Sequence, residues 1–155
     1  MEIERKYLID SLPSNLDSHP HVEIEQGYLC TTPTLRVRRM GAQCFLTVKE
    51  RRPAEAQAIF NREEEFELPH EAYNSLLAKC DGRVVTKTRY YLPLESGLTA
   101  ELDIFHGRHE GLFLVEVEFP NAAAVNNFRP PSWFGADVSA DHRYTNAYLA
   151  SNPVA

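Results

Sequence analysis

The sequence lacks the features that mark several protein classes. It has three cysteines in 155 residues, Cys30, Cys44 and Cys80, and their spacing matches no metal-binding motif. Their odd number and the absence of a signal peptide predict reduced thiols and a cytoplasmic protein, not a disulfide-stabilised secreted one. No apolar run approaches the roughly 20 residues of a membrane-spanning helix, so we expect no membrane partner.

Basic charge is also scarce. Lys and Arg number 16 against 22 for Asp and Glu, which gives a net charge of −6 and argues against a nucleic-acid partner. Neither a P-loop nor a dinucleotide-binding glycine motif occurs, so any phosphate site must be built from side chains. The length fits one domain, which we place at residues 1–155.

Alternation of apolar and polar residues with period two predicts a mainly β fold. The alternating segments are 2–9, 22–30, 34–40, 43–49, 60–68, 84–92, 99–105 and 112–119. Turn-forming residues separate them, such as "TTPT" at 31–34 and "ESG" at 95–97. Eight antiparallel strands are enough to close a barrel.

Three segments favour helices and one favours a loop. The helices are predicted at 70–80, 122–128 and 141–151, and "RRPAEAQA" at 51–58 is predicted to be a polar, mobile loop. The expected fold is therefore α+β but mainly β, an eight-stranded antiparallel closed β-barrel with flanking helices. The helices at 70–80 and 122–128 are expected to cover part of the barrel exterior.

Charged residues fall on one parity of nearly every predicted strand. They are Glu2, Glu4, Lys6, Arg36, Arg38, Lys49, Glu63, Glu65, Lys87, Arg89, Glu101, Asp103, Glu116 and Glu118. The opposite parity is mostly apolar, as in Ile3, Val37 and Leu102. For any single strand, an open sheet with one face in water explains this alternation better than an enclosed interior does. Taken together, however, acids paired at spacing two would repel their neighbours unless opposite charges or ligands intervened, which favours an enclosed, charged interior.

An interior of this kind has a chemical use. Acidic pairs suit a hard divalent cation such as Mg²⁺ or Mn²⁺, which prefers oxygen ligands. Arginine and lysine suit phosphate oxygens, arginine through its bidentate fork and lysine as a point charge. Cation sites that face anion sites across one cavity describe a receptor for a metal-bound polyphosphate.

The N-terminal stretch "EIERKYLI", with the core E-x-E-x-K at Glu2, Glu4 and Lys6, resembles the opening motif of the CYTH superfamily, also called triphosphate tunnel metalloenzymes. Further stretches follow in the order of the family: "EQGYL", "LRVRR", "LTVKE", "EEFELP", "KTRYYL", "ELDIFHG", "LVEVEF" and "DHRYTNAYLA". The resemblance covers essentially the whole chain and is closest to the short, single-domain bacterial members.

The resemblance implies a tunnel that binds a triphosphate and requires Mg²⁺ or Mn²⁺. Glu2, Glu4 and Glu118 would hold one metal ion, and Asp103 and Glu116, with or without Glu118, a second one. Phosphate would be bound by Lys6, Arg36, Arg38, Lys49, Lys87 and Arg89, while Glu63 and Glu65 also match tunnel positions of the substrate site. The implied catalytic residues are Glu2, Glu4, Lys6, Arg38, Asp103, Glu116 and Glu118. Arg143 would either close a tunnel mouth onto the substrate or lie on a surface helix.

The leading expectation is metal-dependent hydrolysis of a triphosphate, with inorganic tripolyphosphate first because the sequence shows no evident base pocket. A class IV-type adenylate cyclase and a thiamine triphosphatase are the alternatives within the family. A polyphosphate- or nucleotide-binding module is the non-enzymatic alternative, against which the complete set of acidic pairs argues. We expect a small-molecule triphosphate as the partner, and a monomer or homodimer as the assembly.

Overall fold

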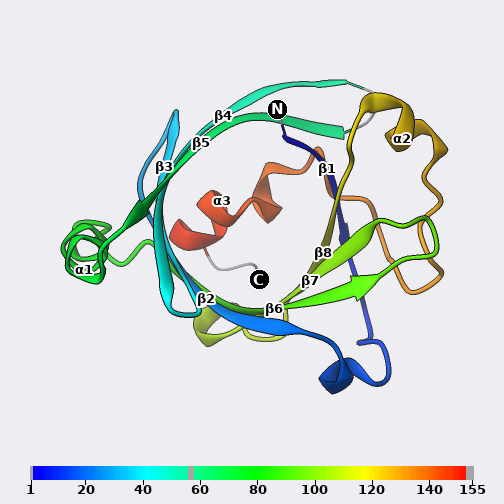
Figure 1. The fold of residues 1–155 in the computed structure, drawn as a ribbon, viewed down its shortest axis with the longest axis horizontal. Coiled ribbons are helices and arrows are strands. Elements are labelled where there is room, and N and C mark those ends of the chain that lie inside the picture. The colour runs from blue at the N-terminus through cyan, green and yellow to red at the C-terminus, as the bar shows by residue number, and fades with distance from the viewer. Residues whose placement is uncertain (1, 56–57, 153–155) are drawn as a thin grey trace.

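Eight antiparallel strands close into a barrel in this computed structural model, which describes residues 2–55 and 58–152, with the backbone alone for 51–55. The strands are β1 (Glu2–Leu8), β2 (His21–Thr31), β3 (Thr34–Met40), β4 (Gln43–Glu55), β5 (Ala58–Leu68), β6 (Val84–Pro93), β7 (Thr99–Phe105) and β8 (Phe113–Glu118). Their order around the barrel is β1-β5-β4-β3-β2-β6-β7-β8, and β8 pairs with β1 to complete the ring (Figure 1). The predicted barrel is confirmed.

The period-two pattern sorts side chains between the inside and the outside of this ring. Lys6 lies opposite Glu116 in the β1–β8 register, and Arg36 lies opposite Thr47 between β3 and β4, all on the inner face. Residues of the other parity, such as Val37 and Leu102, point outward into apolar clusters. The charged parity is therefore the interior of the barrel.

Two helices cover part of the apolar exterior, as predicted. Helix α1 (His70–Ala78) begins after Pro69 and buries Tyr73 against Val37 and Cys44. Helix α2 (Ala122–Asn127) begins at Asn121, whose side chain accepts a hydrogen bond from the Ala124 amide at 2.9 Å. It covers the cluster around β1, β7 and β8 on the opposite side of the barrel (Figure 1). No helix in the described part of the chain has the length and apolar composition of a membrane span.

The C-terminal segment differs from the single helix predicted at 141–151. It contains a short 3-10 turn, η3 (His142–Tyr144), and then α3 (Asn146–Ser151), with Thr145 in an extended conformation between them. The Thr145 hydroxyl accepts a hydrogen bond from the Tyr148 amide at 3.2 Å, so Thr145 caps a new helix and interrupts the predicted one.

Helix α3 lies across one end of the barrel (Figure 1). Leu149 and Ala150 are fully buried against interior residues of that end, among them Tyr28 and Phe105. The β7–β8 connection, which contains the 3-10 turn η2 (Gly107–His109), holds the helix there, because the side chains of Arg108 and His109 bond the backbone carbonyls of Ala150 and Leu149. One end of the tunnel is therefore plugged.

The prediction of a loop at 51–58 is wrong for the residues that the structure describes there, 51–55 and 58. Strand β4 continues to Glu55 and β5 begins at Ala58, with Arg51 opposite Asn61 and a register shift between Arg52 and Glu55. Backbone pairing in a long hairpin does not depend on side-chain polarity, so a polar segment can extend the ladder. Residues 56–57 lie outside the described residues.

Strand β1 receives support from a late segment of the chain. Among the described residues it pairs with β5 at residues 2–4, and beyond them residues 135–139 take over that edge. The Leu8 amide donates to the Ala136 carbonyl and the Val138 amide to the Lys6 carbonyl, both at 2.9 Å. Gly135 is required here, because a Cβ would lie 2.7 Å from the Leu8 carbonyl oxygen. This support fixes the backbone from which Lys6 enters the barrel.

Candidate functional site

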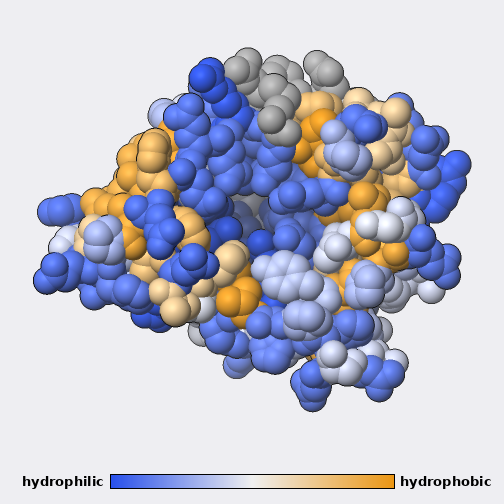
Figure 2. All heavy atoms as spheres, in the orientation of Figure 1, coloured by the Kyte–Doolittle hydropathy of each residue, from blue (hydrophilic) through white to orange (hydrophobic). Residues whose placement is uncertain are grey.

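The barrel encloses a cavity of about 340 Å³. Its charged lining comprises Glu2, Glu4, Lys6, Arg36, Arg38, Lys49, Glu63, Glu65, Lys87, Arg89, Glu101, Glu116 and Glu118. Figure 2 shows hydrophilic side chains gathered around the hollow in the middle of the ring. Of the predicted site residues, only Asp103 and Arg143 are not in this lining.

An acidic cluster, which we define as Glu2, Glu4 and Glu118, occupies the β1–β8 side of the cavity. Each carboxylate offers an oxygen within 4.8 Å of the other two, and Glu4 faces Glu118 directly across the strand pair. Burial, reinforced by Glu116, raises the pKa of Glu4 to about 8. Burial together with Glu101 and Glu2 raises the pKa of Glu118 to about 7. These carboxylates lack sufficient positive charge nearby, which a bound cation would supply.

Glu2 differs from the other two members of the acidic cluster. Burial opposes its ionisation, but Lys49 Nζ at 3.0 Å outweighs that effect and lowers the pKa of Glu2. Asn61 also donates to Glu2 Oε1 at 3.0 Å. Lys49 reaches Glu63 as well, at 3.7 Å, so it links the acidic cluster to β5.

A buried ion-pair group lies beside the cavity on β6 and β7. Asp103, which is 1% exposed, accepts hydrogen bonds from Arg89 Nε at 2.8 Å and Nη2 at 2.9 Å. Lys87 Nζ lies 2.8 Å from the same carboxylate. Although burial opposes ionisation, Arg89 and Lys87 lower the pKa of Asp103. Both carboxylate oxygens are therefore engaged by cations, and the role of Asp103 as a metal ligand stays a prediction.

Glu116 and Lys6 connect the acidic cluster with the plugged end. Lys6 Nζ lies 3.3 Å from Glu116 and donates to the Tyr144 carbonyl at 2.9 Å. Although burial opposes ionisation, Lys6 and then Arg89 hold the pKa of Glu116 well below its usual range. Glu116 is thus an anion already balanced by a cation, unlike Glu4.

Cationic side chains crowd the opposite wall of the cavity. Burial and the charges of Arg36 and Arg89 lower the pKa of Arg38 to about 9. Burial lowers the pKa of Lys87 to about 7, in spite of its contact with Asp103. The buried Arg36 Nε has no hydrogen-bond partner among the described residues. These groups repel one another, and a polyanion would relieve that repulsion.

Several uncharged lining residues were not predicted to be site residues. Tyr28, Thr145 and Asn146 line the cavity, and Asn146 Oδ1 accepts a hydrogen bond from Lys87 Nζ at 2.9 Å. Tyr28 and Asn146 belong to the stretches "EQGYL" and "DHRYTNAYLA" that carry the family resemblance. Those stretches were the only signal that could have identified them.

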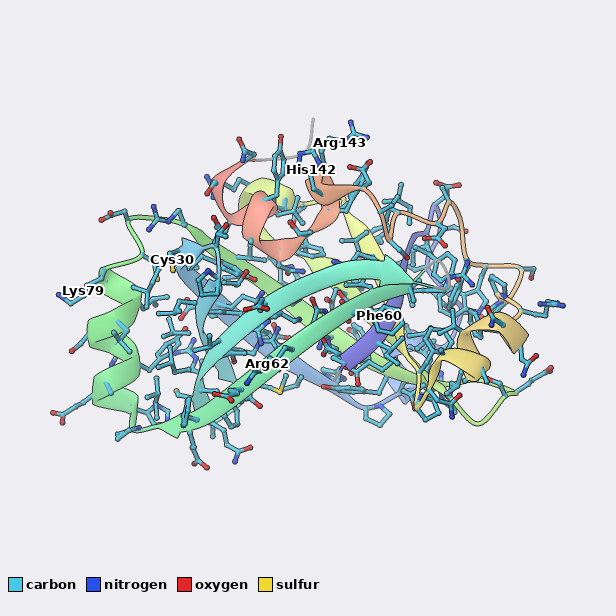
Figure 3. All side chains as sticks on the ribbon, turned by 90° about the horizontal axis from the view of Figure 1, so that it is seen from above. Cys30, Phe60, Arg62, Lys79, His142 and Arg143 are labelled. Atoms are coloured by element: carbon cyan, nitrogen blue, oxygen red, sulfur yellow. The ribbon has the colours of Figure 1, made fainter. Side chains whose placement is uncertain are left out.

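Arg143 lies away from the cavity. Its side chain is 60% exposed and pairs with Asp141 at 2.7 Å. In Figure 3 it points outward from the segment that precedes α3. Among the described residues, the groups that join this segment to the cavity lining are the Tyr144 carbonyl and Asn146. The Arg143 side chain therefore lies on the surface in the 3-10 turn η3, and a contact of Arg143 with the substrate stays a prediction.

Comparison with known proteins shows relatives that are similar over nearly the whole of this chain. An inorganic triphosphatase of Nitrosomonas europaea is 42% identical over 154 residues, which cover 96% of each chain. An inorganic triphosphatase of Acetivibrio thermocellus is 36% identical over 157 residues, which cover 98% of this chain and 94% of the relative.

Solved structures agree with the fold. The crystal structure of an inorganic triphosphatase aligns with a TM-score of 0.73 and 37% identity over 99% of this chain and 97% of that one. A putative adenylyl cyclase from Hippeastrum with a dominant triphosphatase activity aligns with a TM-score of 0.62 and 18% identity, over 82% of this chain and 83% of that one, and supports the fold alone. The family model described as CYTH domain matches residues 1–126. The chain therefore belongs to the CYTH domain family.

Proposed function

We propose that this protein is a metal-dependent inorganic triphosphatase, which hydrolyses a phosphoanhydride bond of tripolyphosphate inside the barrel. One observation carries the proposal: the cavity of the barrel is lined both by the acidic cluster on β1 and β8 and by arginines and lysines, among them Arg36 and Arg38 on β3 and Lys87 and Arg89 on β6. The two relatives similar over nearly the whole chain are both named inorganic triphosphatases, which supports the same activity here.

Glu2, Glu4 and Glu118 are the proposed ligands of a divalent cation. The site suits Mg²⁺ or Mn²⁺, because its donors are carboxylate oxygens and two of the three acids have raised pKa values without an ion. When bound, the ion would neutralise charge on the phosphate oxygens. Glu116 and Asp103 remain proposed participants of a second metal site.

The basic residues are proposed to bind and orient the substrate. Arg36, Arg38 and Arg89 present guanidinium groups to the cavity, and Lys6, Lys49 and Lys87 add ammonium groups. Fixed positive charge of this kind stabilises the charge that develops on phosphate oxygens during phosphoryl transfer. A bound anion would also keep Lys87 protonated, since burial lowers its pKa to about 7.

The plug formed by α3 is proposed to exclude water and to limit how far the substrate enters. Asn146 and Thr145 form part of the cavity wall at that end, and Lys6 and Lys87 are fixed by the Tyr144 carbonyl and by Asn146. The two lysines are therefore held in place before the substrate binds, which reduces the reorganisation needed during the reaction.

The decisive experiment is a substrate panel assayed with purified protein. Tripolyphosphate, pyrophosphate, ATP and thiamine triphosphate are each incubated with Mg²⁺ or Mn²⁺, and orthophosphate, pyrophosphate and cyclic AMP are measured. We expect tripolyphosphate to be converted to pyrophosphate and orthophosphate, with activity lost in excess chelator and restored by added metal. Preferential formation of cyclic AMP from ATP, or full turnover in chelator, would contradict the proposal.

A further inference from the structure

Gln26 is a fully buried polar residue between two side chains of the cavity wall. It lies in the middle of β2, directly opposite Arg38 in the β2–β3 register, and its exposed fraction is 0%. Arg38 Nε donates to Gln26 Oε1 at 2.9 Å, and Gln26 Nε2 donates to the Tyr28 hydroxyl at 2.7 Å. Arg38 and Tyr28 both line the cavity, whereas Gln26 stands behind them.

The direction of these hydrogen bonds follows from the chemistry of the three groups. A guanidinium has donors only, so the side-chain oxygen of Gln26 must face Arg38. The amide nitrogen then faces Tyr28 and donates to a lone pair of the phenol oxygen. The Tyr28 proton is not used in that contact, and among the described residues no acceptor is recorded for it.

We propose that Gln26 is a positioning residue which fixes the Arg38 guanidinium and makes the Tyr28 hydroxyl a hydrogen-bond donor toward a phosphate oxygen in the cavity. The donor chain runs from Arg38 through Gln26 and Tyr28 to the bound anion. This inference rests on the proposed function, since the acceptor is an oxygen of the triphosphate. Gln26 itself does not touch the substrate and acts through the other two residues.

The substitution Gln26→Glu separates the two proposed effects of Gln26, which are to fix Arg38 and to orient the Tyr28 hydroxyl. Gln26→Glu keeps an acceptor for Arg38 but has no hydrogen to donate to Tyr28. The Tyr28 hydroxyl would then donate to the new carboxylate, and its proton would turn away from the cavity. Gln26→Met removes both hydrogen bonds with little change in volume, and serves if the glutamate variant folds poorly. Gln43→Glu, at the exposed start of β4, is the matched control for added charge.

The test is a double-mutant cycle with Tyr28→Phe. In the wild-type background we expect Tyr28→Phe to lower kcat/KM for tripolyphosphate about tenfold or more, as expected for loss of one hydrogen bond to a charged group. In the Gln26→Glu background, Tyr28→Phe should lower kcat/KM less than about twofold, because the Tyr28 hydroxyl proton already points away from the cavity. Gln26→Met leaves the Tyr28 proton unoriented but does not turn it away, so Tyr28→Phe should lower kcat/KM less than in the wild type and more than in Gln26→Glu. Gln43→Glu should leave the full effect of Tyr28→Phe.

Additive losses in the cycle, or kinetics of Gln26→Glu equal to those of Gln43→Glu, would overturn the inference and leave Gln26 as a packing residue. Wild-type turnover of tripolyphosphate tests the proposed function separately. If the wild type binds tripolyphosphate without turnover, the same cycle is measured on the dissociation constant by calorimetry. Non-additive binding then supports the role of Gln26 and additive binding rejects it. If the wild type does not bind tripolyphosphate, both the inference and the proposed function fail.

Discussion

Glu4 provides the strongest test of the charge distribution inside the barrel. The residue is 6% exposed, and the pKa of its carboxyl group is raised to about 8 from an ordinary value of 4.5. Below pH 4.5 both the folded and the unfolded protein hold the proton, so Glu4 has no effect on stability. Between pH 4.5 and 8 the unfolded chain releases the proton while the folded protein retains it, and the free energy of unfolding falls as the pH rises.

The size of the effect follows from the same values. At about 1.4 kcal/mol for each pH unit, the interval from 4.5 to about 8 corresponds to at most about 5 kcal/mol for Glu4. Glu116 and Glu2 contribute to the raised pKa of Glu4, so 5 kcal/mol is an upper limit for one residue. Glu4→Gln has nearly the shape of the protonated acid and does not ionise. Without metal, we expect the variant to become progressively more stable than the wild type as the pH rises.

Urea denaturation in chelator from pH 5 to pH 8.5 measures this difference. The control is Glu95→Gln, in the exposed β6–β7 turn, which should follow the wild type at every pH. Added Mg²⁺ should stabilise the wild type most at pH 8 and should have little effect on Glu4→Gln, because a ligand that binds only the folded state raises stability. Parallel curves for Glu4→Gln and the wild type would refute the assignment of Glu4 to a crowded acidic site.

Three further substitutions test other parts of the site. Glu118→Gln should lower turnover more than tenfold while the free energy of unfolding in chelator stays equal or rises, because the pKa of the Glu118 carboxyl group is raised to about 7. Parallel losses of turnover and stability would indicate a structural role. Arg38→Ala should reduce the increase in melting temperature that tripolyphosphate causes. Equal small increases with ortho-, pyro- and tripolyphosphate, in the wild type and in Arg38→Ala alike, would contradict an enclosed anion site. Arg143→Ala should change kcat/KM less than about twofold, since an exposed ion pair contributes little, and a tenfold loss would show that Arg143 reaches the substrate.

The sequence predicted the barrel because side-chain parity is a local property. Each strand alternates independently of its partners, so the side of Glu4 or Arg36 could be assigned from its neighbours in sequence. Parity alone did not distinguish an open sheet from a closed barrel. The density of like charges favoured the closed barrel, because a sheet face with many like charges needs counter-ions or ligands.

The predictions that were wrong depended on contacts that the sequence does not contain. The end of β4 extends past residue 50 because β5 supplies a backbone partner, which no side-chain pattern reports. The helix predicted at 141–151 is interrupted because Thr145 caps α3. Threonine also occurs inside helices, so the residue type alone did not indicate that a new helix begins there. Gln26 was not recognised as a site residue because a neutral side chain gains its meaning only between Arg38 and Tyr28.

The order of strands in the barrel also has a consequence for folding kinetics. Strands β2 to β5 form one meander and β6 to β8 another, and the two join only where β2 meets β6 and where β1 bridges β5 and β8. Pairings between distant segments form more slowly than local hairpins, so we expect β1 to take its place after residues 113–118 have joined their meander. Glu4 and Glu118 meet across that junction. The burial of these two acids is thus expected late in folding, and Glu4→Gln is expected to slow unfolding while leaving the folding rate nearly unchanged.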